Sequence, residues 1–236
     1  MFNGKMKAVT FSYDDGVTQD RLLIDIFNRY SLKSTFNINS GLLGKDGSLF
    51  IQGKTVAHVK PRPEEVAKIY EGHEIAAHTL THPLLTQLDE QEILRQVCKD
   101  AEELSRLAGY KVQGMAYPCG GKNYDSRVSS ILAEKSGIKY ARTIECNASF
   151  DLQDNLMEFR PTVYHLEWDK LFALAEEFIA LKPDSPKIFY IWGHSYEFDI
   201  ENTWGRFEEF CRLISGRDDI FYGTNSEVLL GKKYNV

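Results

Sequence analysis

Short apolar runs and amphipathic helical patterns alternate along this chain of 236 residues. Runs rich in β-branched and aromatic residues predict buried strands, and apolar positions that recur every three or four residues predict helices. The predicted strands are Lys7–Phe11, Ser34–Ile38, His73–Ala77, Val112–Tyr117, Ile138–Arg142, Lys187–Trp192 and Ile220–Tyr222. The predicted helices are Arg21–Tyr30, Pro63–Tyr70, Asp89–Ala108, Asp125–Ser136, Glu167–Leu181 and Trp204–Ser215.

The segments between these elements indicate one continuous α/β domain. Gly41–Gly53 is typical of a loop or hairpin, and Thr143–Tyr164 follows no regular pattern. About seven strand–helix units follow one another without a Pro- or Ser-rich linker, so we expect a single catalytic domain over residues 1–236. Such alternation builds a parallel sheet, open or closed into a barrel, with its chemistry at the C-terminal ends of the strands.

Composition and charge exclude several classes of partner. The net charge is −6 and no basic run is present, which argues against nucleic acid. No window approaches the ~20 apolar residues of a membrane span, and the N-terminus has no signal-peptide pattern. The four cysteines are widely spaced, without a Cys-x-x-Cys pair, which fits a reducing compartment. We therefore expect a cytoplasmic protein without a membrane span, whose oligomeric state the sequence leaves open.

Polar clusters directly follow two of the predicted strands and together can hold a metal ion. Asp14 and Asp15 come after the first strand, and His78 and His82 after the third. Two histidines four residues apart, on one helical turn, can present ring nitrogens to one ion. With Asp15 they form a set of two imidazoles and one carboxylate that leaves coordination positions open. Zinc is the expected ion, with cobalt, nickel or manganese as alternatives.

The remaining acid of the first cluster has a separate chemical use. Asp14 is free to accept a proton from a water that the ion activates. Taken alone, Asp14-Asp15-Gly16 also reads as a solvated turn, and the two histidines as surface residues. The two clusters support each other, since a cation would relieve the repulsion between adjacent carboxylates.

Two further clusters follow later strands. His194 follows the sixth predicted strand and, with a pKa near neutrality, can protonate a leaving group, while Trp192 would form an apolar wall beside it. After the fourth strand, the backbone N–H of Cys119 could face an oxyanion. Structural packing is an equally good interpretation of Trp192. Cys119 has no histidine at local spacing that could activate its thiol, so we do not interpret it as a nucleophile.

These motifs resemble those of the polysaccharide deacetylases of carbohydrate esterase family four, the NodB-like deacetylases. The family's Thr-Phe-Asp-Asp-Gly motif is similar to Phe11–Gly16, which has one extra residue. Its His-Ser/Thr-x-x-His-Pro motif is matched in full by His78–Pro83, and its Leu-x-His motif loosely by Trp192–His194. The resemblance spans most of the chain.

The resemblance implies an irregular (β/α) barrel of about seven units and a role for each site residue. Asp14 would be the general base, His194 the general acid, and the Cys119 N–H an oxyanion donor. Asp15, His78 and His82 would be the metal ligands. The implied reaction removes an acetyl group, above all an N-acetyl group, from a sugar or polysaccharide. Tyr117 could stack on such a sugar ring, although ordinary packing is an equally good interpretation of this residue.

Two departures from the family motifs leave positions to be assigned. Ala116 stands where the third motif has the arginine that pairs with the base. Arg142 or Arg160 could replace it, and we favour Arg142, which ends the next strand. The acid that orients the catalytic histidine is not recognisable, and Asp151 and Asp199 are candidates.

Two rival functions remain open from the sequence. The first is an amidase or cyclic-imide hydrolase that acts on a small metabolite. The second is a catalytically inactive carbohydrate-binding relative, against which the complete set of acids and histidines argues.

Overall fold

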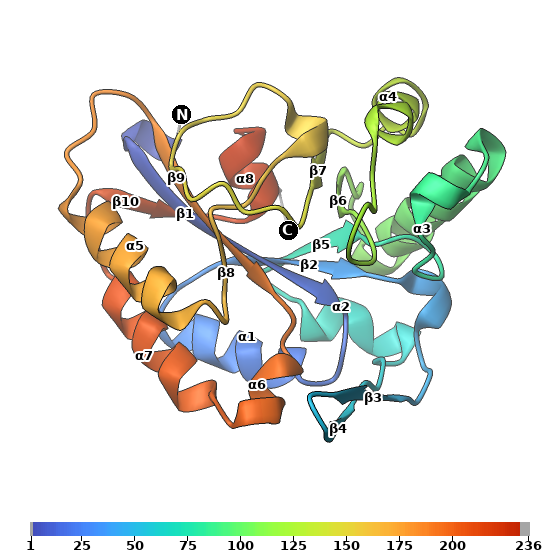
Figure 1. Cartoon of the computed structure of the whole chain (residues 1–236), viewed down its shortest axis with the longest axis horizontal. Coiled ribbons are helices and arrows are strands. Elements are labelled where there is room, and N and C mark those ends of the chain that lie inside the picture. Colours follow the sequence, from blue (N-terminus) through green and yellow to red (C-terminus); the bar gives the residue numbers. More distant parts are fainter. Residues whose placement is uncertain (1, 232–236) are drawn as a thin grey trace.

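The structure, a computed structural model, describes residues 2–231. Eight strands form one sheet in the order β7-β6-β5-β2-β1-β9-β8, with β10 also paired to β1 (Figure 1). All of these pairings are parallel. The strands are β1 (Lys7–Asp15), β2 (Ser34–Ile38), β5 (Glu74–Ala77), β6 (Gly114–Ala116), β7 (Tyr140–Arg142), β8 (Val163–Tyr164), β9 (Lys187–Gly193) and β10 (Ile220–Tyr222).

Helices follow most strands and cover the outside of this curled sheet (Figure 1). They are α1 (Asp20–Arg29), α2 (Val66–Ile69), α3 (Glu90–Ala108), α4 (Ser126–Lys135), α5 (Trp168–Ala180), α6 (Glu197–Glu201), α7 (Trp204–Ile214) and α8 (Asn225–Leu229). All nine residues of β1 are buried, as expected for a central parallel strand covered on both faces. The arrangement is the predicted irregular (β/α) barrel.

Most predicted elements are present, with shifts at their ends. Asp89 caps α3 by accepting a hydrogen bond from the Glu92 N–H, and Gly109 ends this helix in the left-handed conformation. β1 runs to Asp15, so the paired carboxylates lie on the strand and not after it. The short elements α6, α8 and β8 were missed, because none of them is long enough to show a hydrophobic period.

The irregular segment 143–164 connects the two edges of the sheet. Phe159 forms a parallel bridge with Arg142 at the end of β7. Four residues later, Val163 begins β8, which pairs with β9. The side chain of Phe159 is buried and its ring packs on Tyr190 at 5.2 Å. A segment without regular pattern in the sequence therefore closes the barrel.

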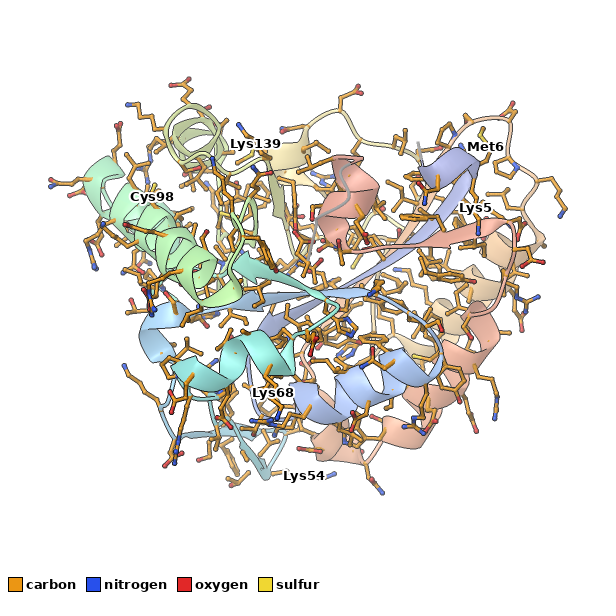
Figure 2. The ribbon with its side chains drawn as sticks, turned by 180° about the vertical axis from the view of Figure 1, so that it is seen from behind. Lys5, Met6, Lys54, Lys68, Cys98 and Lys139 are labelled. Atoms are coloured by element: carbon orange, nitrogen blue, oxygen red, sulfur yellow. The ribbon has the colours of Figure 1, made fainter. Side chains whose placement is uncertain are left out.

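Outside the main sheet, β3 (Ser48–Ile51) and β4 (Lys54–Ala57) form an antiparallel hairpin. It occupies the predicted loop or hairpin region 41–53 and extends beyond it. Seen from behind, Lys54 marks this hairpin at the lower edge of the molecule, and Cys98 marks α3 at the opposite upper side (Figure 2). The apolar side of the hairpin packs on Val17, Tyr196 and Ile200. These contacts fix the hairpin beside the C-terminal ends of the strands.

Two further expectations concern membranes and disulfides. Among residues 2–231, no helix is both long and apolar enough to cross a membrane. All four cysteines, Cys98, Cys119, Cys146 and Cys211, are free thiols.

Candidate active site

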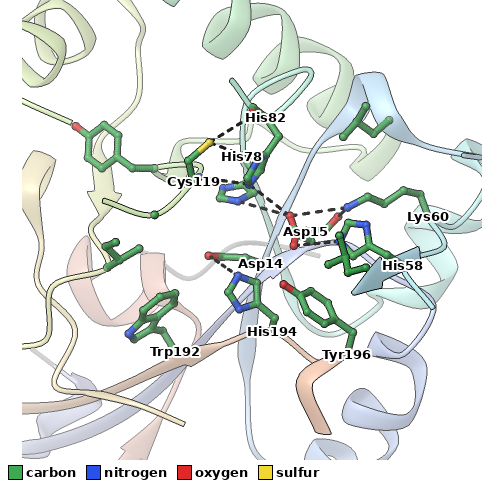
Figure 3. A pocket seen from close by; sticks show the side chains of 15 residues that line it. Asp14, Asp15, His58, Lys60, His78, His82, Cys119, Trp192, His194 and Tyr196 are labelled. Carbon is green, nitrogen blue, oxygen red and sulfur yellow. Dashed lines mark hydrogen bonds and ion pairs between the residues drawn. The ribbon is translucent and has the colours of Figure 1, made fainter. Parts of the chain in front are cut away.

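The polar clusters predicted from the sequence meet in one pocket at the C-terminal ends of the strands (Figure 3). The pocket has a volume of about 420 Å³. Its wall includes all nine predicted site residues except Arg142, which lies fully buried behind it. Parallel strands bring their carboxyl ends to the same edge, so residues far apart in the chain become neighbours here.

The three predicted metal ligands lie close together. The Oδ1 atom of Asp15 is 3.9 Å from His78 Nε2 and 3.6 Å from His82 Nε2. One donor atom from each of the three residues falls within 4.8 Å of the others. Among residues 2–231, this is the one group of three or more such side chains that meets this criterion. Separations of this size suit donors that share one ion at about 2 Å from each.

The protonation states of these side chains also suit a metal ion. His78 Nδ1 lies 2.9 Å from the Ala116 carbonyl oxygen, so it carries the proton and Nε2 presents a lone pair. Burial lowers the pKa of His78 to about 4 and also lowers the pKa of His82. Burial acts to raise the pKa of Asp15, but a hydrogen bond from His58 and the charge of Lys60 hold it well below its usual value.

The segment between the two histidines is not the predicted helical turn. Residues 78–83 form an irregular loop, and Thr79 (φ 68°) and His82 (φ 62°) adopt the left-handed conformation. Asp15 (φ 78°), the last residue of β1, and Cys119 (φ 69°), on the loop after β6, do the same. Such backbone strain in residues other than glycine persists where surrounding contacts enforce it, often at functional sites.

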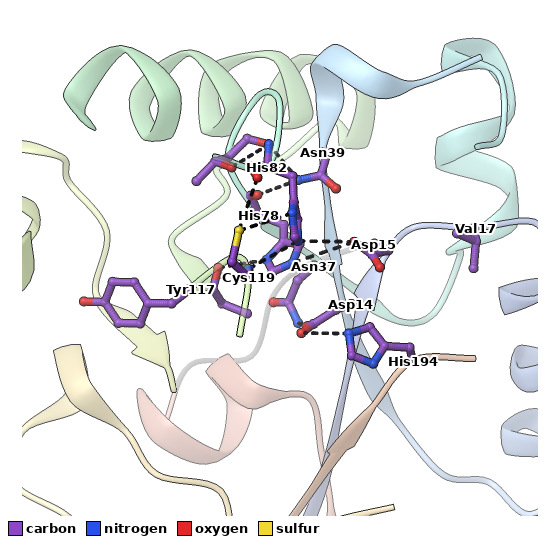
Figure 4. Close-up of polar contacts among 12 residues, drawn as sticks. Asp14, Asp15, Val17, Asn37, Asn39, His78, His82, Tyr117, Cys119 and His194 are labelled. Atoms are coloured by element: carbon purple, nitrogen blue, oxygen red, sulfur yellow. Dashed lines mark hydrogen bonds and ion pairs between the residues drawn. The ribbon is translucent and has the colours of Figure 1, made fainter. Parts of the chain in front are cut away.

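Contacts from α3 and from the residue that follows β2 hold this loop. Asp100 on α3 accepts hydrogen bonds from the His78 N–H at 2.9 Å and the Ser40 N–H at 2.7 Å. Gln96, one turn earlier, accepts from the Thr81 N–H at 3.1 Å and donates to the Thr81 hydroxyl at 3.0 Å. Asn39 donates to the carbonyl oxygen of Thr79 at 3.0 Å (Figure 4). The histidine pair is thus positioned by tertiary contacts.

Asp14 forms a buried ion pair with Arg142, which contacts both of its carboxylate oxygens. Asn37 on β2 also donates to Asp14 Oδ1 at 2.8 Å. Burial acts to raise the pKa of Asp14, but the charge and hydrogen bond of Arg142, together with His78 and His194, outweigh it and lower this pKa. The alternative residue, Arg160, is exposed and lies 3.8 Å from Glu145, away from the pocket. Arg142 therefore has the contact that the family's missing arginine would make.

His194 faces Asp14 across the pocket wall, with its Nε2 atom 4.0 Å from Asp14 Oδ2 (Figure 4). Its other nitrogen, Nδ1, lies 3.1 Å from Glu197 Oε2, which also accepts from the His194 N–H at 3.2 Å. Burial acts to lower the pKa of His194, but the charge and hydrogen bond of Glu197, together with the charges of Asp15 and Asp14, raise it to about 9.

The prediction that Asp151 or Asp199 orients His194 was wrong. Asp151 pairs with Lys187 at 2.6 Å, and Asp199 accepts a hydrogen bond from Trp204 at 2.8 Å. Glu197, which the sequence analysis missed, contacts the imidazole instead. The spacing of three residues between His194 and Glu197 was the available signal, since α6 begins at Glu197 and turns its side chain back toward the strand end.

A second buried histidine completes this network. His165 Nε2 lies 2.8 Å from the same Glu197 oxygen, and its Nδ1 is 3.3 Å from the Tyr13 hydroxyl. A Cβ atom on Gly193 would lie 2.2 Å from the His165 ring, so this position requires glycine. Nothing in the local sequence around His165 indicated this contact.

Cys119 and Tyr117 differ in how they relate to the pocket. The Cys119 N–H points at His82 Nε2 at 3.4 Å, so this donor lies beside the nitrogen that would bind an ion. Tyr117 has no exposed surface, stacks on Tyr124 and donates to the Met157 carbonyl oxygen at 2.8 Å. Its ring points away from the ligands (Figure 4), which contradicts the prediction that it stacks on a sugar.

Trp192 forms part of the pocket wall as predicted. Its indole N–H donates to the Cys146 sulfur at 3.2 Å. The Arg142 guanidinium lies 4.4 Å from the centre of its ring, so one residue both walls the pocket and covers the buried cation. His58 and Lys60, which follow β4, also line the pocket and contact Asp15, and the sequence analysis had not singled them out.

Comparison with known proteins places this fold and site in a family. The sequence profile described as polysaccharide deacetylase matches residues 3–141, more than half of the chain. The chain therefore belongs to the polysaccharide deacetylase family.

Similar curated proteins carry related names. The peptidoglycan-N-acetylmuramic acid deacetylase PdaC of Bacillus subtilis is 28% identical over 125 residues, which are 51% of this chain and 23% of that protein. A peptidoglycan-N-acetylglucosamine deacetylase of Bacillus cereus is 32% identical over 115 residues, which are 48% of this chain and 36% of that protein. The matched part is thus about a third or less of each relative's length.

Solved structures show the same fold. A family 4 carbohydrate esterase from Streptomyces lividans has a TM-score of 0.56 at 15% identity and covers 93% of this chain and 92% of its own. A structure described as T48 deacetylase with substrate has a TM-score of 0.57 at 18% identity, covering 100% of this chain and 96% of its own. At these identities the likeness shows the fold alone.

Proposed function

We propose that this chain is a metal-dependent deacetylase that removes N-acetyl groups from a polysaccharide such as peptidoglycan. Membership of the polysaccharide deacetylase family and the names of the relatives support this substrate class. The observation that carries the proposal is the meeting of Asp14, Arg142, His194 and the set Asp15–His78–His82 in one pocket. A protein that only binds carbohydrate has no need of such a set.

Asp15, His78 and His82 would hold one divalent ion, with zinc expected first. Two neutral imidazoles and an ionised carboxylate are the donors that zinc and similar first-row metals prefer. When bound, such an ion supplies Lewis-acid chemistry, which lowers the pKa of a water molecule toward ~7 and stabilises negative charge on an acyl oxygen.

The proton acceptor in this proposal is Asp14. The buried contact with Arg142 keeps its carboxylate ionised at neutral pH and fixes its orientation. Asp14 takes the proton of the water that attacks the acetyl carbonyl carbon. The Cys119 N–H, held by a left-handed backbone beside His82, donates to the carbonyl oxygen as negative charge develops there.

The proton donor in this proposal is His194. Its raised pKa of about 9 keeps the imidazolium protonated at neutral pH. It gives its Nε2 proton to the sugar nitrogen as the carbon–nitrogen bond breaks, which releases acetate and a free amine. Glu197 orients the ring through Nδ1, so the proton that is transferred sits on the nitrogen that faces the pocket.

The cytoplasmic location and the single domain over 1–236 stay predictions. The four free thiols support a reducing compartment.

The first test combines metal analysis with an activity measurement. We expect about one divalent ion per chain in the wild type and none in the double variant His78→Ala/His82→Ala, with both proteins folded by circular dichroism. Zinc-loaded wild type should release acetate from N-acetylglucosamine oligomers, and the double variant should not. If the loaded protein cleaves a small cyclic imide or amide and leaves the oligomers intact, the substrate proposal is wrong. Absence of metal binding would contradict the whole mechanism.

A further inference from the structure

The hairpin β3–β4 brings two side chains from outside the family motifs to the proposed metal site. His58 Nε2 lies 3.2 Å from Asp15 Oδ2. Lys60 donates from Nζ to the backbone carbonyl oxygen of Asp15, and the same nitrogen is 3.9 Å from Asp15 Oδ1. Figure 3 shows both side chains on the far side of Asp15 from the histidine pair.

The two oxygens of the Asp15 carboxylate thus face different partners. Oδ1 faces the Nε2 atoms of His78 and His82, and Oδ2 faces His58. A carboxylate oxygen only accepts hydrogen bonds, so His58 Nε2 must carry the proton and donate it. An oxygen engaged in this way is oriented away from the histidine pair.

We propose that His58 is a positioning residue that fixes Asp15 as a one-oxygen metal ligand through Oδ1. The inference rests on the proposed function, since it presumes an ion between Asp15, His78 and His82. Hydrogen-bond partners of metal ligands orient the donor atoms, and their loss typically lowers metal affinity about 10–100-fold. His58 acts here through Asp15 and does not itself contact the reacting atoms.

The position of His58 is set before any ion binds, because neighbouring segments anchor the end of the hairpin. The His58 N–H donates to the Gly47 carbonyl oxygen at 2.8 Å, and the Val59 carbonyl accepts from the Thr18 N–H at 2.9 Å. The Tyr196 ring meets the His58 ring edge-on at 5.1 Å. A side chain that projects from an anchored backbone and packs on a neighbouring ring can orient a carboxylate at little entropic cost.

Asp15 needs such external support, because its backbone is strained. Its φ of 78° lies in the left-handed region, which glycine adopts routinely and asparagine and aspartate only occasionally. Lys60, which is buried, holds the carbonyl group of this residue, and His58 holds the carboxylate. The hairpin therefore fixes both ends of the ligand.

His58 is better described as a positioning residue than as a fourth ligand. Its ring nitrogens do not join the group of donor atoms that lie within 4.8 Å of one another in the described part of the chain. Its hydrogen bond to Oδ2 also occupies the nitrogen that faces the site.

The test measures zinc affinity by competition with a chelator for the wild type and three variants. We expect His58→Ala to bind zinc about 10–100-fold more weakly, whereas His58→Gln, whose amide can still donate to Oδ2, recovers most of the affinity. Thr55→Ala, an exposed position on the same hairpin, is the matched control and should bind like the wild type. Melting temperatures of the metal-free proteins show whether each variant is folded.

Cobalt substitution separates positioning from ligation. The visible spectrum of Co²⁺-loaded His58→Gln should match that of the wild type, because the same three side chains bind the ion. A changed spectrum would make His58 a ligand and overturn the inference. Wild-type zinc affinity in folded His58→Ala would also overturn it while leaving the proposed function intact. Failure of the wild type itself to bind zinc would overturn both.

Discussion

At the scale of single residues, two buried charges face each other, and each has an opposite charge behind it. Asp14 and His194 lie 4.0 Å apart, with Arg142 behind the carboxylate and Glu197 behind the imidazole. Burial alone would neutralise both groups, so these partners decide their charge. The proton acceptor stays ionised and the proton donor stays protonated at the same neutral pH.

Glu197→Gln should move the alkaline limit of activity to lower pH. His194 must be protonated to act as an acid, so activity falls as the pH rises through its pKa, about 9 in the wild type. Without the Glu197 charge, only the charges of Asp15 and Asp14 still oppose burial, so this pKa falls below its wild-type value. The measurement is the pH profile of kcat.

Asp199→Asn is the matched control for this substitution, because Asp199 is an exposed acid on the same helix. It should leave the profile unchanged. A Glu197→Gln profile that coincides with that of the wild type would show that Glu197 does not set the pKa of His194.

Arg142→Ala should reduce turnover strongly while zinc binding persists. The change leaves Asp14 buried without its cation, so we expect kcat to fall by about 10²-fold or more and stability to fall by about 3 kcal/mol. Arg142→Lys keeps the charge but loses the bidentate contact with Asp14, so its kcat should lie between those of the wild type and Arg142→Ala. Single-turnover kinetics and metal analysis on folded protein provide the check. Unchanged turnover would remove Arg142 from the mechanism.

At the scale of elements, α3 positions the histidine loop. Its side chains Gln96 and Asp100 bond to the backbone between residues 78 and 81, and the Gln96 carbonyl accepts from the Leu80 N–H at 3.0 Å. The helix itself is predictable, because it has a capping Asp89, a terminal Gly109 and a clear apolar face. Its polar contacts to the loop follow only from the way it packs on β5.

Gln96→Ala should weaken zinc binding about tenfold, although Gln96 is not itself one of the proposed metal ligands. It removes two part-buried hydrogen bonds to the exposed residue Thr81, which we expect to lower stability by about 0.5–1.5 kcal/mol. Gln91→Ala, at an exposed position of the same helix, should change stability by less than about 0.5 kcal/mol. Denaturant unfolding and chelator competition measure both effects. Equal zinc affinities for the two variants would refute the role of α3.

At the scale of the whole molecule, α8 fills one end of the barrel with polar contacts. The Asn225 side chain donates to the Thr10 hydroxyl at 2.9 Å and accepts from the Tyr190 hydroxyl at 2.8 Å. The next N–H, of Ser226, donates to Glu74 at 3.0 Å. These residues come from β1, β5 and β9, so a short C-terminal helix ties together strands that are distant in the chain.

Asn225→Ala should lower the free energy of unfolding by about 2–4 kcal/mol, because buried hydroxyl groups on two strands lose their partner. Since the pocket lies at the other ends of the strands, the fraction that remains folded should bind zinc normally. Denaturant unfolding followed by circular dichroism tests the first expectation. A stability equal to that of the wild type would show that the polar contacts of α8 add nothing.

Local patterns in the sequence determined the elements and most of the chemistry. Periodicity and caps gave the strands and long helices, because burial on one face imposes a period on the residues. Placement after strands indicated the pocket residues Asp14, Asp15, His78, His82 and His194, because parallel strands end on one edge. The choice of Arg142 over Arg160 followed from the same rule.

Only the tertiary structure decided which side chains from distant segments of the chain contact the site residues. His165, His58 and Asn37 reach the site from the end of β8, from the segment after β4 and from β2. No local spacing in the sequence links them to the residues that they contact, which are Glu197, Asp15 and Asp14. The left-handed conformation of four residues likewise could not be predicted, because none of them is a glycine. They are Asp15, Thr79, His82 and Cys119. Long-range packing enforces these strained positions, and a sequence pattern records only the residue's own preference.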